Sequence, residues 1–151
     1  MSISEKIGED DIATGRCFDL AWLRQQWLPF AARNAKLAAQ GVVAASLDAL
    51  VTARASWNGH NASGWKADVV AANGFDERMG YGGEDRELGE RLEHAGITGK
   101  RIRHRAIVLH LDHPRGYVRK DIIEKNESIR ADTRRQRLLR TPHGLDQHDA
   151  E

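Results

Sequence analysis

Residues 73–96 read NGFDERMGYGGEDRELGERLEHAG, and this stretch determines how the rest of the chain is interpreted. It opens with Asn73-Gly74, a pair that tolerates positive φ angles and is typical of a helix end. A glycine-rich run at residues 80–83 follows, where the backbone can approach a ligand closely. Beyond it, apolar residues recur at the spacing of a helix face, namely Leu88, Leu92 and Ala95. The stretch therefore predicts a helix end, a glycine loop and a new helix that stops at Gly96.

Two acidic residues, Glu84 and Asp85, stand where this new helix begins. Carboxylates are favoured in the first turn of any helix, because they meet unpaired backbone amides and the positive end of the helix dipole there. Helix capping alone would therefore explain both acids. The glycine loop before them adds a second interpretation, since an acid beside open backbone can serve as a general base that faces a sugar or another polyol. The rest of the helix predicts exposed pairs four residues apart, Arg86 with Glu90 and Glu87 with Arg91.

These residues resemble the C-terminal half of family 2 glycosyltransferases and the related galactosyltransferase C-terminal domain. The resemblance extends from about Trp57 to Asn126 and is carried by residues 73–77 and 82–85 with Leu88, Arg91, Leu92 and Gly96. By this resemblance, Asp85 is the base that deprotonates the acceptor hydroxyl, Glu84 contacts the acceptor, and Tyr81 flanks the sugar. The glycine loop, in particular Gly82 and Gly83, would bind substrate.

A second loop, residues 57–64, belongs to the same prediction. In the resembling enzymes a Gly-x-Asn segment faces the bound sugar nucleotide or the acceptor, and Gly59-His60-Asn61 fits that pattern. Asn61 and Trp57 are therefore candidate substrate-binding residues. A purely structural role remains open, because Ser63 could cap the helix that follows and the glycines could simply form turns.

The run Ala106-Ile-Val-Leu-His-Leu111 predicts a short buried strand. It ends at His110-Leu-Asp-His113, and two histidines three residues apart can share a metal ion, although the spacing alone does not establish one. In the resembling family, a histidine at the end of this strand binds the divalent cation, Mn²⁺ or Mg²⁺, that holds the diphosphate of the donor. By that resemblance His110 is the candidate metal ligand, and His113 is the reserve.

The donor-binding part of such an enzyme has no counterpart in the sequence. An Asp-x-Asp pair is absent, and no alternation of strands and helices precedes Trp57. The expected fold is of the α/β class, as an α-rich fragment: the acceptor-side half of a GT-A-type fold, with helices around a short sheet. We expect a helical segment at residues 1–56, the galactosyltransferase-like domain at 57–126, and a basic helix with a disordered tail at 127–151. The chain would then be a fragment, a split subunit or a truncated product that needs a separate donor-binding chain and, with it, the cation.

Helical periodicity predicts the remaining elements, which are helices at residues 18–28, 31–40, 46–55, after Ser63, and at 122–140. In the helix after Ser63, the expected buried stripe is Trp65, Val69 and Ala72. The last helix carries five arginines and few acids, so a solvated surface helix is its default interpretation. The alternatives are a peripheral contact with anionic lipid, nucleic acid or an acidic partner. Residues 142–151 have the composition of a disordered tail.

The overall composition limits the class of protein. A hydrophobic share of 40%, a charged share of 30% and a net charge of +1 indicate a soluble globular protein for which no nucleic acid partner is expected. Cys17 is the single cysteine, so an intramolecular disulfide is impossible, and a reducing, cytoplasmic location is expected, with the inner face of the membrane as an alternative. No run of about 18 apolar residues occurs, so the sequence predicts neither a membrane span nor an export signal.

The favoured prediction is a metal-dependent, inverting glycosyltransferase domain of the hexosyltransferase type, which moves a sugar from a nucleotide-sugar donor to a saccharide hydroxyl. Two other classes of protein remain open. The first is a non-catalytic module in which Tyr81, Trp57 and the two acids hold a glycan or a partner. The second is a small metal hydrolase that uses Glu84, Asp85, His110 and His113, for which the sequence offers few convincing ligands.

Overall fold

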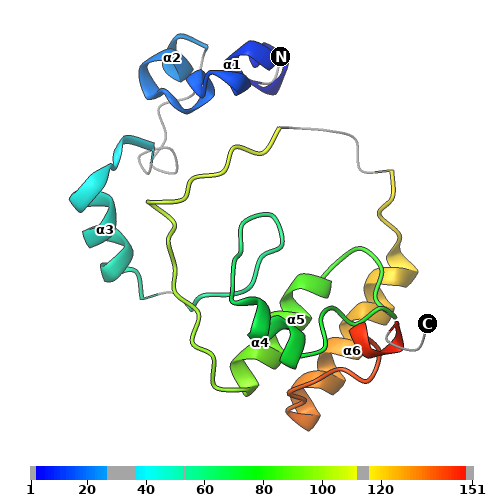
Figure 1. Cartoon of the computed structure of the whole chain (residues 1–151). Coiled ribbons are helices and arrows are strands. Elements are labelled where there is room, and N and C mark those ends of the chain that lie inside the picture. The colour runs from blue at the N-terminus through cyan, green and yellow to red at the C-terminus, as the bar shows by residue number, and fades with distance from the viewer. Residues whose placement is uncertain (1–2, 27–36, 53, 112–115, 149–151) are drawn as a thin grey trace. The chain divides into compact units, whose positions relative to one another are not determined.

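The computed structural model describes residues 3–26, 37–52, 54–111 and 116–148. The chain groups into two compact units. Unit 1 comprises Met1–Ala53 and Arg101–Pro114, and unit 2 comprises Arg54–Lys100 and Arg115–Glu151. Each unit is described by itself. All regular secondary structure within the described ranges is helical (Figure 1).

The expected α/β fold class is therefore wrong. The described residues contain no strand, so there is no short sheet for the helices to surround. The strand predicted at residues 106–111 has an irregular backbone, although Ile107 and Leu109 do pack against the apolar cluster of unit 1. A strand needs a neighbouring strand as its hydrogen-bond partner, and no other described segment supplies one. The apolar pattern of this segment thus reflects the partial burial of Ile107 and Leu109, while Val108 and Leu111 are exposed.

Unit 1 is built from short helices: η1 (Ile3–Lys6), α1 (Glu9–Ala13), η2 (Arg16–Phe18), α2 (Leu20–Gln25) and α3 (Gly41–Leu50). Asp19 caps α2, because its carboxylate accepts a hydrogen bond of 2.9 Å from the backbone N–H of Trp22. The apolar cluster of the unit consists of Cys17, Trp22, Leu23 and Leu37. The helix predicted at residues 18–28 is present as α2. Residues 27 and 28 of that predicted helix, and residues 31–36 of the helix predicted at 31–40, lie outside the described residues.

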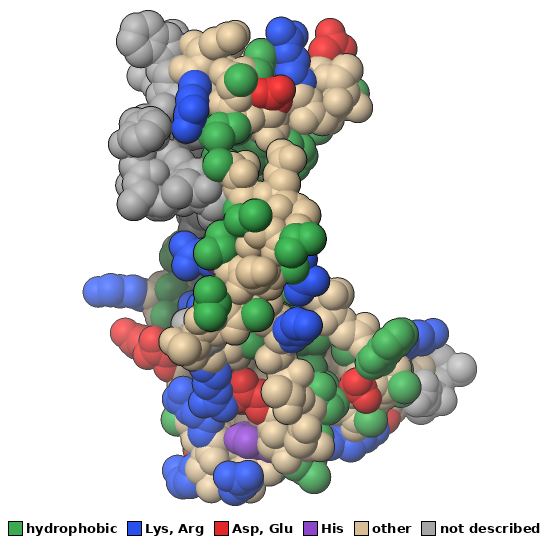
Figure 2. Space-filling model, turned by 90° about the vertical axis from the view of Figure 1, so that its left-hand side faces the viewer, with side chains coloured by type: hydrophobic (Ala, Val, Ile, Leu, Met, Phe, Trp, Pro, Cys, Tyr) green, Lys and Arg blue, Asp and Glu red, His purple; other side chains and the backbone are tan. Residues whose placement is uncertain are grey.

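Helix α3 replaces the helix predicted at residues 46–55, since it begins at Gly41 and ends at Leu50. It buries Ala44 and Asp48, while its large apolar side chains are exposed, with Val42 at 82% and Leu50 at 75%. Figure 2 views the molecule from the side on which Figure 1 draws α3, and exposed hydrophobic side chains lie across that face. Apolar packing therefore contributes little to holding α3 within unit 1.

A polar contact holds α3 instead. The buried carboxylate of Asp48 accepts hydrogen bonds from the backbone N–H of His104 at 2.8 Å and from the side chain of Arg105 at 2.9 Å. The Nδ1 atom of His104 also lies 2.9 Å from the same carboxylate. Burial of Asp48 opposes ionisation, but these hydrogen bonds and the charge of Arg105 outweigh it and lower the pKa of Asp48 to about 2.

Unit 2 contains α4 (Lys66–Ala71), α5 (Glu84–His94), α6 (Lys120–Gln136) and η4 (Leu145–Gln147), and α5 packs along α6 (Figure 1). The helix predicted after the glycine loop is confirmed as α5. The core cluster consists of Ala72, Leu88 and Leu92, with partly buried apolar residues around it, namely Trp57, Val69 and Ile97. The predicted stripe of α4 is correct for Ala72 and wrong for Trp65, which precedes the helix and is 80% exposed.

The ion pair predicted between Glu87 and Arg91 exists, but the prediction that it is exposed is wrong. Both side chains are fully enclosed, and Arg91 Nη2 lies 2.8 Å from Glu87 Oε2. Arg91 also donates hydrogen bonds to the backbone carbonyls of Ala72 and Gly74, and Thr133 of α6 donates to Glu87 at 2.8 Å. The pair therefore joins α5 to the end of α4 and to α6.

The described part of the predicted disordered tail, residues 142–148, is ordered. The side chain of Asn73 donates hydrogen bonds to the Thr141 carbonyl at 2.8 Å and to the Asp146 carboxylate at 2.6 Å, and it accepts one from the Asp146 N–H at 3.0 Å. Gly144 packs so closely that a Cβ atom there would overlap the carbonyl oxygen of Asn73. Residues 141–146 are thus fixed to the start of the motif at residues 73–77.

No helix among the described residues has both the length and the apolar content to cross a membrane.

Candidate functional site

Hydrogen bonds from α5, which follows the loop, and from α6 hold the glycine loop at residues 80–83 in place. Gly82 and Gly83 have φ angles of 114° and 90°, a region that favours glycine, and Gly83 caps α5. The carboxylate of Glu84 accepts a hydrogen bond of 2.6 Å from the Gly82 N–H, which closes the loop at the helix start. From α6, the side-chain amide of Asn126 donates to the carbonyls of Gly80 and Gly82 at 2.9 Å each. These contacts fix the conformation of the glycine loop within unit 2.

Asp85 connects the two loops that the sequence analysis singled out. One carboxylate oxygen accepts a hydrogen bond of 2.8 Å from the backbone N–H of Gly59, and the other accepts one of 2.7 Å from the N–H of Arg86. Its exposure is intermediate. The first contact places the Gly59-His60-Asn61 segment beside the start of α5, although the two are 26 residues apart in the sequence.

Tyr81 lies at the surface of the glycine loop, with 41% of its area exposed. Its ring meets that of Tyr117 edge to face, with the ring centroids 4.7 Å apart and an interplanar angle of 79°. Tyr117 is also exposed, at 49%. Sequence reasoning did not find Tyr117, because it follows the predicted strand by several residues and no local pattern connects it to the glycine loop.

Trp57 and Asn61 lie in different environments. Trp57 is partly buried against the core cluster of Ala72, Leu88 and Leu92, and it packs so tightly on α5 that a Cβ atom at Gly89 would clash with it. Asn61 is exposed, and its backbone N–H donates a hydrogen bond of 2.9 Å to Asn58 in the turn of the loop. Trp57 thus anchors the loop to the core, while the Asn61 side chain reaches the surface.

The candidate metal ligands belong to unit 1. His110 is exposed, and His113 lies outside the described residues. The described part of the chain contains no group of three or more His, Cys, Asp or Glu side chains that could hold a metal ion. One imidazole holds Mn²⁺ or Mg²⁺ weakly, so the described residues do not by themselves fit the divalent cation that the family resemblance implies.

The motif at residues 73–77 has a structural role that the sequence did not reveal. The carboxylate of Asp76 is buried and accepts hydrogen bonds from the side chain of Arg78 at 2.7 Å and from the hydroxyl of Thr141 at 2.8 Å. Burial opposes ionisation of Asp76, but these hydrogen bonds outweigh it and lower the pKa of its carboxyl group. The backbone N–H of Glu77 donates to the His143 carbonyl at 2.8 Å. Asp76 therefore holds the segment after α6 and faces no open site.

Comparison with known proteins bears on the same region. Residues 54–114, less than half of the chain, match a protein-family model described as the N-terminal domain of galactosyltransferase. The match supports a glycosyltransferase-like domain, and it includes both loops that Asp85 connects. It does not support the narrower expectations of a C-terminal half or of the GT-A type. No curated protein and no solved structure matches the chain significantly.

Proposed function

We propose that this chain is a glycosyltransferase domain that transfers a sugar from a nucleotide-sugar donor to a saccharide hydroxyl, with Asp85 as the general base. Two observations support the proposal. Residues 54–114 are similar to a galactosyltransferase domain, and Asp85 joins two loops that lie within this range. The position of Asp85 carries the mechanism, because a base must have a fixed orientation to meet the incoming hydroxyl.

The geometry of Asp85 suits this role. A carboxylate has about four hydrogen-bond acceptor positions, and the N–H groups of Gly59 and Arg86 use one position on each oxygen. Among the described residues no other group bonds to these oxygens, so each keeps a free acceptor position, while the two backbone contacts fix the plane of the carboxylate. A hydroxyl bound there can pass its proton to Asp85 as its oxygen attacks the anomeric carbon and the nucleoside diphosphate leaves from the opposite side. Direct displacement of this kind inverts the configuration at that carbon.

The surroundings of Asp85 offer contacts for a saccharide. Tyr81 and Tyr117 present exposed aromatic edges beside the glycine loop, and aromatic rings pack well against the apolar faces of sugars. Glu84 holds Gly82 in place, so it supports the loop while one of its oxygens remains uncommitted. The donor and any divalent cation would be held by a separate donor-binding chain or segment.

Transfer by the chain together with a donor-binding partner tests this proposal. Asp85→Asn should lower turnover by a factor of about 10² to 10⁴, the usual contribution of a general base, and leave acceptor affinity unchanged. Asp121→Asn is the matched control, because Asp121 is also an acid in the first turn of a helix, α6, and its exposed carboxylate pairs with Arg119. Equal turnover of the Asp85→Asn variant and the unmodified protein would overturn the role of Asp85.

A non-catalytic glycan-binding or partner-binding module is the second candidate. It is favoured by the fact that Glu84 and Asp85 both accept hydrogen bonds from backbone N–H groups, as acids with a purely structural role would. Under this alternative the chain binds saccharide, the binding depends on Tyr81, and no donor supports transfer even with a partner chain present. Saccharide titrations of a Tyr81→Ala variant and transfer assays with a panel of sugar nucleotides separate the two functions.

A further inference from the structure

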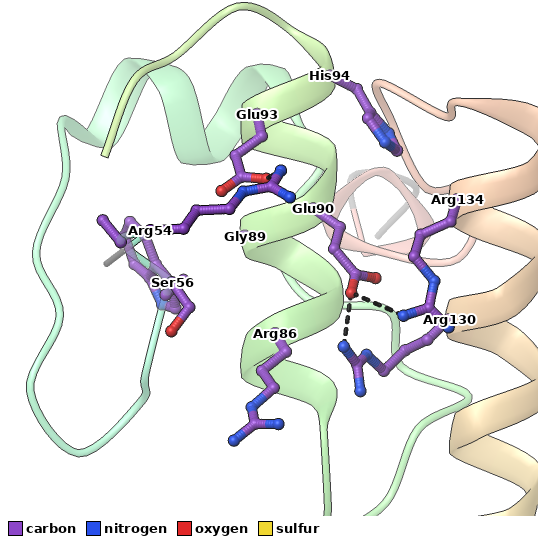
Figure 3. A pocket seen from close by; sticks show the side chains of 11 residues that line it. Arg54, Ser56, Arg86, Gly89, Glu90, Glu93, His94, Arg130 and Arg134 are labelled. Carbon is purple, nitrogen blue, oxygen red and sulfur yellow. Dashed lines mark hydrogen bonds and ion pairs between the residues drawn. The ribbon is translucent and has the colours of Figure 1, made fainter. Parts of the chain in front are cut away.

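Unit 2 contains a cleft of about 510 Å³. Residues 54–57 form one wall, and side chains of α5 and α6 form the others (Figure 3). Its volume falls within the range of roughly 300–1,000 Å³ that is usual for small-molecule sites. Arg86, which lines the cleft, directly follows Asp85 in the sequence of α5.

The charged side chains of the cleft are unequal in number. Four arginines line it, namely Arg54, Arg86, Arg130 and Arg134, together with two glutamates, Glu90 and Glu93. The cleft therefore has an excess of two positive charges. His94 lines the same cleft, and its Nδ1 atom donates to the Leu138 carbonyl at 2.9 Å. An excess of cationic groups around a hollow attracts anions.

Both glutamates of the cleft already form ion pairs with arginines. Glu93 pairs with Arg54, and a single oxygen of Glu90 lies 2.5 Å from Arg130 and 3.5 Å from Arg134 (Figure 3). Two guanidinium groups therefore share one carboxylate oxygen. Among the described residues, no carboxylate pairs with the side chain of Arg86.

Pairing within the cleft is also incomplete at the level of atoms. The second oxygen of Glu90 and the Nε atom of Arg130 are buried and have no hydrogen-bond partner among the described residues. Arg134 is half exposed, at 53%, and its only carboxylate partner among them is the distant, shared oxygen of Glu90. Arg86 and Arg134 can thus each present a guanidinium group to a ligand without breaking a strong ion pair.

We infer that this cleft binds the negatively charged group of a saccharide, a carboxylate or a sulfate or phosphate ester, with Arg86 and Arg134 as its main donors. Guanidinium groups suit such ligands because their planar set of N–H donors matches the oxygens of carboxylates and phosphates. That the ligand is a saccharide rests on the proposed function. The cleft adds that the acceptor carries acid groups and that one of them binds in the cleft lined by Arg86, the residue after Asp85.

Titration of the full chain, followed by NMR of its backbone and tryptophan indole N–H signals, tests the inference. The probes are methyl glucuronide, glucose 6-sulfate, glucose 6-phosphate, neutral methyl glucoside and inorganic phosphate. The charged sugars should shift signals of the cleft and bind about tenfold or more tightly than the neutral sugar, because charge-assisted hydrogen bonds form with them alone. Inorganic phosphate should bind more weakly than glucose 6-phosphate, because it lacks the sugar.

Variants show whether the binding depends on this cleft. Arg86→Gln and Arg134→Gln should each weaken binding of the charged sugars about tenfold or more, and Arg135→Gln should leave it unchanged. Arg135 is the neighbour of Arg134 on α6, but it pairs with Asp132 and does not line the cleft. The side chains of Arg86 and Arg134 are both exposed, so we expect the variants to fold. The number of folded-state NMR signals shows directly whether each variant is folded.

Three results would overturn the inference: equal affinity for charged and neutral sugars, inorganic phosphate binding as tightly as glucose 6-phosphate, or equal losses in the Arg134→Gln and Arg135→Gln variants. These titrations contain no donor and measure no transfer. Failure of the anion site therefore leaves the Asp85 experiment unaffected, and a failure of the Asp85 experiment leaves the anion site to be judged by these titrations alone.

Discussion

Arg91 forms two kinds of contact while its side chain is completely enclosed. Its Nε atom lies 2.9 Å and 3.0 Å from the two oxygens of Glu87, and its terminal nitrogens donate to the carbonyls of Ala72 and Gly74. Each of these carbonyls lies beyond the end of α4, where no helical N–H is available to them. The Ala72 carbonyl also accepts a hydrogen bond of 3.4 Å from the Thr141 N–H, so the carbonyl that depends most on Arg91 is that of Gly74.

Replacing Arg91 by Met should destabilise unit 2 by about 3–5 kcal/mol, because the buried carboxylate of Glu87 would lose its charged partner. Urea unfolding followed by circular dichroism measures the loss. Arg135→Met is the control, since Arg135 is exposed at 72% and its pair with Asp132 lies at the surface, so its cost should stay within about 1 kcal/mol. Similar losses in both variants would show that the enclosure of Arg91 is wrong.

Asp48 gives the stability of unit 1 a dependence on pH. Its folded-state pKa of about 2 lies below the ordinary value, 3.8, so the ionised carboxylate stabilises the fold above about pH 4. The stabilisation should disappear as the pH falls from about 4 to 2, because the proton then binds the unfolded chain first. Asp48→Asn should lower the melting temperature at pH 7 and flatten this acid-side decline.

Melting curves at a series of pH values between 2 and 7 measure both effects. Asp10→Asn is the control, because Asp10 is an exposed acid of α1 in the same unit. Three carboxyl groups of unit 2, Asp76, Asp121 and Asp146, also have lowered pKa values, so protection of the α3 amides from hydrogen exchange should be followed to isolate unit 1. An unchanged acid-side decline of that protection in the Asp48→Asn variant would contradict the assignment.

The glycine loop and the start of α5 form an element whose backbone tolerates little substitution. Gly83 has a φ of 90°, and a Cβ atom there would lie 3.1 Å from Cδ of Arg130. Gly83→Ala should therefore cost about 1–2 kcal/mol from the left-handed backbone alone. Gly116→Ala is the control, because a Cβ atom at Gly116 meets nothing within 4 Å. Thermal unfolding compares the two, and equal stability would show that the loop does not have this conformation.

Local sequence patterns predicted these elements where the information is itself local. Helix α5 follows from apolar residues at helical spacing, and the glycine loop follows from residue types that favour positive φ angles. The predicted strand failed because pairing needs a second strand, which no pattern within residues 106–111 can report. The predicted start of the helix at residue 46 is wrong because α3 begins at Gly41, a residue type more typical of a helix end.

Contacts between distant residues could not be predicted. Glu87 and Arg91 have the spacing of an ordinary surface pair. They are buried because Thr133 and the carbonyls of Ala72 and Gly74, all distant in the sequence, pack against them. The same reason explains why the sequence did not reveal the contacts of Asn126, of Tyr117 and of the charged side chains that line the cleft. Each of these residues is separated from its partner by 36 or more positions in the sequence. Asp85 is a candidate because a resemblance to a family motif, and not its own neighbourhood, marks it.

The two units have separate apolar clusters, so they should respond separately to loss of packing. Leu23 in unit 1 and Leu88 in unit 2 are almost completely buried, and truncation of either to Ala should cost about 2–5 kcal/mol. Hydrogen exchange measured by NMR should show reduced protection of α1 and α2 in Leu23→Ala and of α5 and α6 in Leu88→Ala. Leu50→Ala, at a side chain that is 75% exposed, is the control. Equal loss of protection throughout the chain in both variants would show a single cooperative unit.

The attachment of residues 141–146 to Asn73 also has a consequence for biosynthesis. A ribosome synthesises a protein from its N-terminus, so Asn73 leaves the exit tunnel long before Thr141 and Asp146 do. Until those residues emerge, the buried side chain of Asn73 lacks the partners that satisfy it. The loop that precedes the glycine run should therefore mature late, and nascent chains stalled before residue 141 should be cleaved there by proteases that spare the finished protein.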